Sequence, residues 1–482
     1  MKYKNIITSI FAAATLMSCG DSFLELDNPA GLTYDKFYKT EADFQSALDG
    51  CYYNLKTIPR YLLTFNETTT DNTYLHIDDG TYQENQYDGM YVSPSSMPVS
   101  NFWRDSYKAI ASANMVISRI GSSLVSAETQ KVFINEAKFI RALCYFNMVR
   151  VFGGVPLYDK EIIDFNETYR VRRSSVDEVY ALIIQDLIDA QNIDNERNST
   201  QAAVAGGKVN STAVKALLGK VYLFKHDYAN AITTLSNIIG KDYRLLDNPA
   251  DLYNPATPIN DEVIFAINYE RVDGQNNLSA FNFLPKYSKG ILPLIQGSDN
   301  GDGMHNLEDV LVASFDPTDK RAALIGTWME GTTKYYYTTK YLDLGTTPTP
   351  NNSSSDFIFI RYADVLLMMA DALNQTDKTV DAYKYVNDVR KRAGITNLPE
   401  GFTKEQMNNA LAQERQKEFL CEADRWFDLS FRGFNYLKTT LNAAYPTSHT
   451  KKAEVKDHMN LFPIPSTEIN LKPGILEQNP GY

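Results

Sequence analysis

The sequence predicts a mainly α-helical protein of stacked tetratricopeptide-like helix pairs, with a loop-rich insertion that carries a few short strands. Three observations predict this fold. Apolar residues recur every three or four positions from residue 40 to about 241, and again from 361 to about 438, which is the period of one helix face. The helical segments in 215–239 have the residue spacing of a tetratricopeptide repeat. Between the two helical blocks, residues 242–360 are rich in Pro, Gly, Asn and Asp, which interrupt regular structure.

The first block contains two long amphipathic segments, 102–120 and 136–152. In each, large apolar residues fall on one face at helical spacing, and the second segment ends at Gly153, Gly154 and Pro156. We therefore expect Trp103, which lies on this face, to be buried. The same reasoning places Trp426 of the second block in the core.

The stretch 215–239 has the residue spacing of a tetratricopeptide repeat. The matching positions are Leu218, Gly219, Tyr222, Ala231 and Leu235. A weaker match consists of Met369, Ala370, Leu373, Ala382 and Val386. Gly and Ala are small where two antiparallel helices cross closely. Since one pair cannot bury its apolar face alone, several pairs should stack.

The insertion contains β-like runs at 263–267, 335–341 and 357–360. The sequence thus divides into a signal peptide (1–18), an N-terminal helical region (19–241), the variable insertion (242–360), and a C-terminal helical region with an extended, proline-containing tail (361–482). Irregular segments of ordered proteins tend to carry function. We therefore look for the ligand site in the insertion and in the irregular stretch 66–101.

The N-terminus resembles a lipoprotein signal. Lys2 and Lys4 precede an apolar stretch, 6–17, that is too short to span a bilayer. Leu16-Met17-Ser18-Cys19 then resembles a bacterial lipobox, in which Cys19 becomes the acylated N-terminus. The alternative is an ordinary secretory signal with a chance cysteine. Acidic residues directly after Cys19 are similar to the export pattern of surface lipoproteins, so we expect an outer-membrane protein that faces the cell exterior.

Composition argues against nucleic-acid binding. The net charge is -12, and loss of Lys2 and Lys4 with the signal peptide makes it -14. No run of basic residues could hold a polyanion. The other cysteines, Cys51, Cys144 and Cys421, fit no metal motif and are predicted to be buried apolar residues. No metal or cofactor is expected, although the loop 299–303 (Asp-Asn-Gly-Asp-Gly) weakly resembles a calcium loop.

No catalytic motif is apparent. The five histidines form no zinc-protease pattern, and the chain has no nucleophile elbow or phosphate loop. A glycosidase needs only two carboxylates, so the acidic set Glu414, Glu418, Glu422 and Asp428 deserves comparison with such a pair. Glu414, Glu418 and Glu422 are four residues apart and would share one helix face, and we favour ion pairing of the set with the nearby Arg415, Lys417 and Arg425.

Several motifs together resemble the SusD/RagB family, in family order. They are 101–103 (Asn-Phe-Trp) with 107–114, 136–142 running to 152–157 (Phe-Gly-Gly-Val-Pro-Leu), 361–367 with 386–390, 414–418 with 425–429 (Arg-Trp-Phe-Asp-Leu), 462–465 (Phe-Pro-Ile-Pro) and 478–482. The resemblance implies a lid on a SusC-type TonB-dependent barrel in the outer membrane. Such a lid traps a nutrient, often an oligosaccharide and sometimes a peptide, and performs no chemistry.

Aromatic rings outside the helical core pattern are the candidate glycan contacts, because flat rings cover the apolar faces of sugars. Trp328 in the insertion is the first candidate, with packing inside a sheet as the alternative. The others are Tyr74, Tyr82, Tyr87, Tyr91, Tyr335 and Tyr337. If 335–337 is a strand, Tyr335 and Tyr337 share one face. Peptide capture and, less favoured, a surface glycosidase remain the alternative functions.

Overall fold

The computed structural model of the chain describes residues 37–76, 84–193, 207–258, 260–271, 277, 279–286, 288, 301–343, 353–449 and 452–482. The signal peptide, Cys19, Tyr82 and the first two residues of the 299–303 loop lie outside these ranges. Within them, no helix combines the length and the apolar character needed to cross a bilayer.

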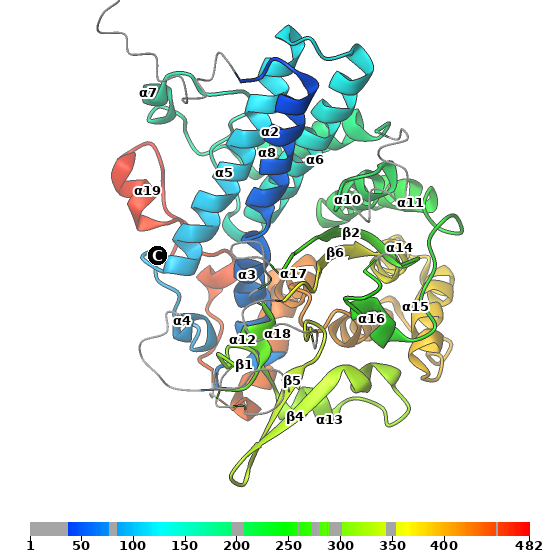
Figure 1. Ribbon diagram of the computed structural model, residues 1–482. Coiled ribbons are helices and arrows are strands. Elements are labelled where there is room, and N and C mark those ends of the chain that lie inside the picture. Colours follow the sequence, from blue (N-terminus) through cyan, green and yellow to red (C-terminus); the bar gives the residue numbers. More distant parts are fainter. Residues whose placement is uncertain are drawn as a thin grey trace, which may run out of the picture.

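The helices stack side by side, which confirms the predicted fold class (Figure 1). Helix α5 packs against α2 and α6, α6 against α8, α8 against α10, and α11 against α14. Local sequence sets the start of two of these helices, because Thr40 with Asp43 forms a capping box at α2 and Ser175 with Glu178 forms one at α8. The bounds are α2 Glu41–Leu55, α3 Ile58–Leu63, η2 Thr64–Thr68, α4 Asn85–Asp88, α5 Met97–Arg119, η3 Ile120–Ser122, α6 Ala127–Phe152, α7 Phe165–Thr168, α8 Val176–Ala190, α10 Ser211–Phe224 and α11 Tyr228–Ser236.

Both predicted repeat pairs are helical hairpins, α10–α11 and α14–α15. A Cβ atom on Gly219 would lie 2.5 Å from Leu235 Cδ2, so this glycine permits the close crossing of α10 and α11. Leu235 therefore packs against α10 within its own pair. The second helical block comprises α14 Tyr362–Gln375, α15 Thr379–Ala393, α16 Lys404–Glu418, α17 Arg425–Phe431, α18 Phe434–Ala444, η6 Tyr445–Thr447, η7 Asp457–Asn460 and α19 Ser466–Leu471.

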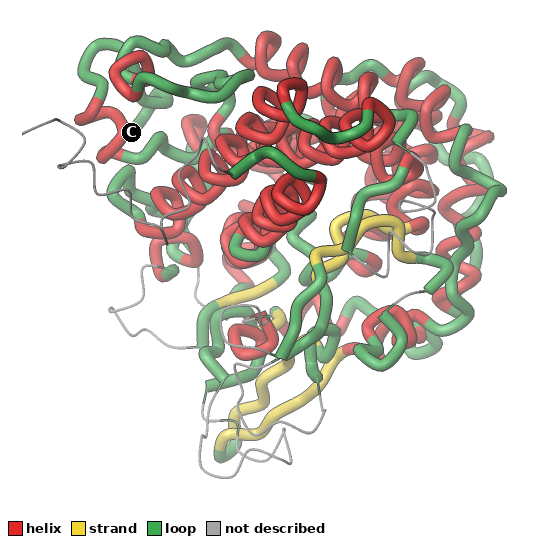
Figure 2. Tube along the Cα trace, turned by 45° about the horizontal axis from the view of Figure 1, so that its top comes forward, coloured by secondary structure: helices red, strands yellow, loops and turns green. Residues whose placement is uncertain are grey.

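Within the described residues the strands form three two-stranded antiparallel sheets (Figure 2), and the sheet of β2 and β6 packs against helices α10 and α14. The predicted β-like runs 263–267 and 357–360 are confirmed as β2 and β6, whereas the run 335–341 is a strand only as far as Thr338, the last residue of β5. Strand β2 pairs with β6, β4 with β5, and β1 with β3. The bounds of the strands and connecting helices are β1 Thr73–Tyr74, η4 Pro249–Tyr253, β2 Val263–Ile267, α12 Ser279–Phe283, β3 Asn306–Leu307, α13 Asp309–Ala313, η5 Lys320–Leu324, β4 Ile325–Glu330, β5 Thr333–Thr338 and β6 Phe357–Arg361.

One large apolar core draws residues from both helical blocks and from the insertion. Trp103 and Trp426 belong to it, as predicted, and so do the three free thiols of Cys51, Cys144 and Cys421. Burial raises the pKa of Cys51 to about 12, which makes its thiol unreactive at neutral pH. The division of the mature chain at residues 241 and 360 stays a prediction.

Candidate functional site

The hairpin β4–β5 gathers three of the predicted ligand residues on one face. Trp328 lies opposite Tyr335, and Gly326 lies opposite Tyr337 in the antiparallel register. Since residues two apart on a strand share a face, Glu330 joins them. Trp328 and Tyr335 are partly exposed, whereas Tyr337, nearer the body of the protein, is buried. The hairpin projects from the body, with its turn at the far end (Figure 1).

His76 completes this surface from a distant part of the chain. Its ring stacks on Tyr335, with 4.0 Å between ring centroids and 18° between planes. Its Nε2 atom lies 3.1 Å from Glu330 Oε2. Burial lowers the pKa of His76 although Glu330 acts in the opposite direction. Burial and the Glu330 carboxylate raise the pKa of Tyr335. We call Trp328, Tyr335, His76 and Glu330 the hairpin platform.

A buried lysine binds the backbone of residues 68–73, which precede His76 in the chain. Lys452, whose side chain is fully buried, donates from Nζ to the carbonyl oxygens of Thr68, Thr70 and Thr73, at 2.7, 2.5 and 2.6 Å. The backbone N–H of His76 then donates to Gly303 O at 2.9 Å. These bonds fix the end of β1 beside the hairpin.

Gly326 is required by the ring of Tyr337. A Cβ atom there would lie 2.3 Å from Tyr337 Cζ. We expect Gly326→Ala to displace this ring and to lower the free energy of unfolding by roughly 1–3 kcal/mol, the usual cost of overpacking. Urea unfolding of both proteins measures the change.

The control for Gly326→Ala is Gly50→Ala in α2. A Cβ atom at Gly50 meets nothing within 4 Å. This substitution should stabilise the protein by up to about 1 kcal/mol, because Ala favours a helix over Gly. Equal stabilisation by both substitutions would contradict the role assigned to Gly326.

The remaining tyrosines predicted as ligand contacts do not join the platform. Tyr87 is completely buried, and its hydroxyl lies 2.8 Å from Ser96 Oγ. Tyr74 is 3% exposed and stacks on His449. The prediction took both from an irregular stretch as surface residues, but Tyr74 lies in the segment 64–75, which is almost entirely buried, and Tyr87 lies on the buried side of α4. Tyr91 is exposed, and within the described residues no contact links it to the hairpin. Tyr82 lies outside the described residues.

Sequence reasoning did not include His76 or Glu330 in the platform. Glu330 had a signal, since it lies two residues after Trp328 on a strand and so shares its face. His76 had none. It is 254 residues away from Glu330, and only the pairing of β1 with β3 brings it to the hairpin.

The acidic set Glu414, Glu418, Glu422 and Asp428 is ion-paired, as favoured, but the predicted partners are mostly wrong. Helix α16 ends at Glu418, so Glu422 does not continue its face. Only Asp428 pairs with a predicted residue, Arg415. The other partners are distant in sequence: Arg321 and Arg390 bind Glu414; Arg321, Arg361 and Arg392 bind Glu418; and Arg361 and Lys340 bind Glu422.

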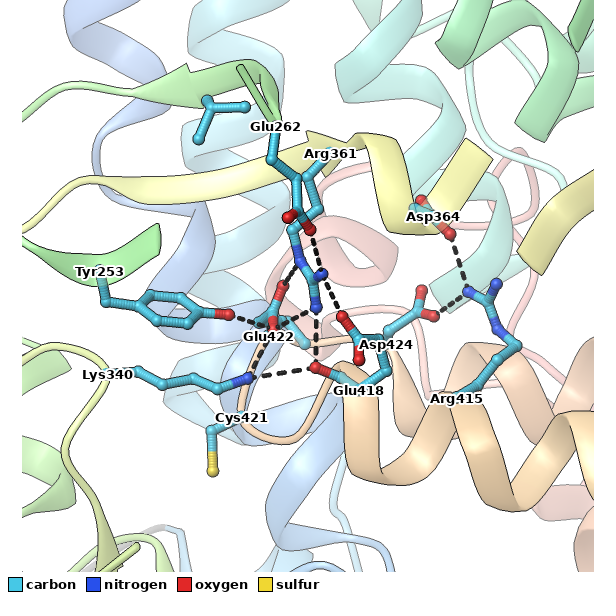
Figure 3. Close-up of polar contacts among 12 residues, drawn as sticks. Tyr253, Glu262, Lys340, Arg361, Asp364, Arg415, Glu418, Cys421, Glu422 and Asp424 are labelled. Carbon is cyan, nitrogen blue, oxygen red and sulfur yellow. Dashed lines mark hydrogen bonds and ion pairs between the residues drawn. The ribbon is translucent and has the colours of Figure 1, made fainter. Parts of the chain in front are cut away.

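Arg361 lies at the centre of this network (Figure 3). Its Nε and Nη atoms donate to Glu422 Oε2 at 2.9 Å, to Glu262 Oε1 at 3.0 Å and to Glu418 Oε1 at 2.5 Å. Burial opposes ionisation of Glu418, yet Arg392, Arg361 and Arg321 hold the pKa of its carboxyl group well below the usual range. Arg361 and Lys340 likewise lower the pKa of Glu422 against the effect of burial. Glu418 and Glu422 therefore stay ionised and engaged with cations, which makes them unsuited to donate a proton.

A strained loop connects α16 to α17 next to this network. Cys421 and Ala423 both have φ near +61°, a left-handed conformation that is costly for residues other than glycine. The backbone N–H of Ala423 donates to Glu67 Oε1 at 2.9 Å, and Asn72 Nδ2 donates to Glu67 Oε2 at 2.8 Å. Burial raises the pKa of Glu67 to about 7.

Glu67 makes stability depend on pH. A raised pKa means that the folded state keeps a proton, between pH 4.5 and 7, that the unfolded state has lost, so stability falls as pH rises through this window. We expect Glu67→Gln to remove this loss. Measured by urea unfolding, the stability of the variant relative to the parent should increase by roughly 2–3 kcal/mol from pH 5 to pH 7.5. Parallel pH dependences would contradict the assignment.

Two family models match the chain. One, described as "SusD family", matches residues 320–482, and the other, described as "Starch-binding associating with outer membrane", matches residues 22–223. Two SusD-like proteins of Formosa agariphila are 26% and 29% identical to the chain, with all of each chain aligned.

Solved structures share the fold. A SusD-like protein of Bacteroides fragilis aligns with a TM-score of 0.79 at 22% identity, over 93% of this chain and 99% of its own. A laminarin-binding SusD-like protein aligns with a TM-score of 0.75 at 23% identity, over 92% and 100%. Surface glycan-binding protein A of Bacteroides thetaiotaomicron, in complex with laminarihexaose, aligns with a TM-score of 0.76 at 19% identity, over 92% and 100%.

Proposed function

Since this chain belongs to the SusD/RagB family, we propose that it is a surface lipoprotein that binds a glycan and delivers it to a SusC-type TonB-dependent transporter. In this proposal Cys19 carries the lipid that anchors the protein to the outer membrane, facing outward. The protein captures the glycan and does not cleave it.

The hairpin platform is the observation that carries the proposal. Trp328 and Tyr335 present partly exposed rings on one face of a projecting hairpin, and rings of this kind cover the C–H faces of sugars. Glu330, whose side chain is 42% exposed, supplies carboxylate oxygens that accept hydrogen bonds from hydroxyl groups. His76 holds this carboxylate at the edge of the aromatic surface.

Binding without hydrolysis agrees with the state of the acidic residues. A glycosidase needs one carboxylic acid with a raised pKa and a second carboxylate beside it, both within reach of the substrate. The buried Glu414, Glu418 and Glu422 are instead paired with arginine and lysine. Burial does raise the pKa of Glu67 to about 7 and that of Asp428 to about 6, but these side chains are 0% and 3% exposed and so out of reach of a substrate. Two solved neighbours are named as binding laminarin or laminarihexaose, so β-glucans are a reasonable first ligand class to test.

Affinity electrophoresis of the lipid-free chain, residues 20–482, in gels that contain different polysaccharides tests the proposal. We expect retardation by one class of polysaccharide and no release of reducing ends from it. Retardation by no polysaccharide, together with binding to a peptide library, would replace glycan by peptide as the captured nutrient. Release of reducing ends would revive the glycosidase alternative.

Anchoring and partnership are tested in cells. Metabolic labelling with a palmitate analogue should mark the parent protein and not Cys19→Ala. The parent should copurify with a TonB-dependent barrel after detergent extraction of outer membranes. An unlabelled parent, or one that leaves the membrane fraction as readily as Cys19→Ala, would contradict the lipid anchor.

A further inference from the structure

A cavity of about 660 Å³ shares no lining residue with the hairpin platform. It is lined by α5, by residues 156–169 with α7, and by α19. Figure 1 shows α7 and α19 beside α5 on the same side of the molecule. Its volume is within the range of about 300–1,000 Å³ that is usual for ligand sites. Trp103, Tyr107 and Tyr158 are among the aromatic residues of its lining.

The rim of the cavity exposes large apolar side chains. Ile163 is 86% exposed, Phe165 76% and Leu471 55%, and all three line the cavity. Such a cluster of apolar side chains at a cavity indicates a surface that is covered in the working protein. The surface thus calls for an apolar occupant.

The described chain begins at the edge of this cavity. The Tyr38 hydroxyl donates to Met115 Sδ at 3.9 Å, and the guanidinium group of Arg119 lies 5.2 Å from the centre of the Tyr38 ring. Both Met115 and Arg119 line the cavity. The described part of the chain therefore begins beside the cavity.

The segment 20–36 has the composition that the cavity requires. It carries an apolar cluster, Phe23, Leu24 and Leu26, close to its start. Four acidic residues and one lysine give the segment a net charge of -3. The lining of the cavity has the opposite balance, with Arg104, Arg119, Lys160 and Lys472 against Glu161 and Glu468. The segment thus matches the cavity both in apolar side chains and in the sign of its charge.

We propose that the N-terminal segment 20–36 folds back and seats Phe23, Leu24 and Leu26 in this cavity. The 10 residues between Leu26 and Phe37, extended at about 3.3 Å each, reach up to roughly 30 Å. A tethered segment has an effective concentration in the mM range, so a weak contact keeps it bound. The docking does not depend on the glycan role. If Cys19 carries lipid, the docked segment leaves only residues 20–22 as a free tether and turns the cavity toward the membrane.

Disulfide trapping in residues 20–482 tests the docking. Leu24→Cys is combined with Ile163→Cys at the rim, or, as a matched control, with Leu124→Cys. Leu124 is 89% exposed, and its N–H donates to Lys39 O at 3.2 Å, so it also lies beside the start of the described chain, but it does not line the cavity. Under mild oxidation we expect the 24–163 disulfide to exceed the 24–124 disulfide by about fivefold or more, a difference in effective concentration.

Hydrogen exchange gives a second measure. Phe165→Ser and Leu471→Ser change exposed side chains, so the fold should persist, and exchange at residues 20–27 should become several-fold faster in the double variant. Equal yields of the two disulfides, with exchange unaffected by the double variant, would overturn the proposal. Disulfides found mainly between two molecules would overturn it too, because a second copy would then fill the cavity.

Discussion

Replacing Arg361 by methionine is expected to lower the free energy of unfolding by about 3–5 kcal/mol, the usual effect of breaking a buried ion pair. The guanidinium group is 2% exposed and binds three carboxylates, those of Glu262, Glu418 and Glu422, whose side chains are 0–5% exposed. Methionine keeps most of the volume but leaves these charges with fewer partners. The effect is large because a buried charge that loses its partner keeps its full desolvation cost.

Urea unfolding followed by circular dichroism measures this loss, with Arg172→Met as the control. Arg172 also forms a bidentate ion pair, with Glu178, but the two side chains are 65% and 44% exposed. An exposed pair contributes about 0–1 kcal/mol, so the control should stay close to the parent. Equal losses in the two variants would show that burial is not what makes the Arg361 network important.

The Trp328→Ala variant is expected to lose most glycan binding. Removing a central aromatic anchor typically costs about 2 kcal/mol or more, which corresponds to at least roughly 30-fold weaker binding. Trp328 also forms, with Tyr335 opposite it, the aromatic part of the platform. Affinity electrophoresis at several concentrations of the retarding polysaccharide measures the change.

The neighbouring Met329→Ala variant is the matched control. Met329 is 53% exposed and lies on the same strand, but its side chain points to the opposite face of the hairpin. Its removal should leave retardation unchanged. Unchanged retardation of Trp328→Ala would keep glycan capture and place the site elsewhere. Equal losses in both variants would point to damage to the hairpin as a whole.

The stacked helices could be predicted because their signals are local. The spacing of Gly219 and Ala231, and the helical period around Trp103, depend on residues within one or two turns of a helix. The ion pairs could not be predicted in the same way. Residues on one helix suggested Arg415, Lys417 and Arg425 as partners, whereas tertiary packing brings Arg321, Arg361 and Arg392 to the same carboxylates.

The candidate site shows the same limit. The period of a strand predicted that Tyr335 and Tyr337 share a face, and the placement of Trp328 opposite Tyr335 required only the pairing of adjacent strands. Exposure was harder to predict. Tyr87 and Tyr335 both lie in tyrosine-rich sequence, but Tyr87 is buried in the core and Tyr335 is partly exposed.

Local sequence patterns predict the helical repeat architecture, the SusD/RagB resemblance and three short strands of the insertion, because each depends on residue order and on periods of a few residues; the strand β4, which carries Trp328, was not predicted. Tertiary packing alone determines which tyrosines are buried, which arginines pair with Glu414, Glu418 and Glu422, and that His76 stacks on Tyr335. These contacts join residues that are tens to hundreds of positions apart in the sequence. Burial and ion pairing depend on which distant segments pack against a residue, and the local sequence pattern does not contain that information.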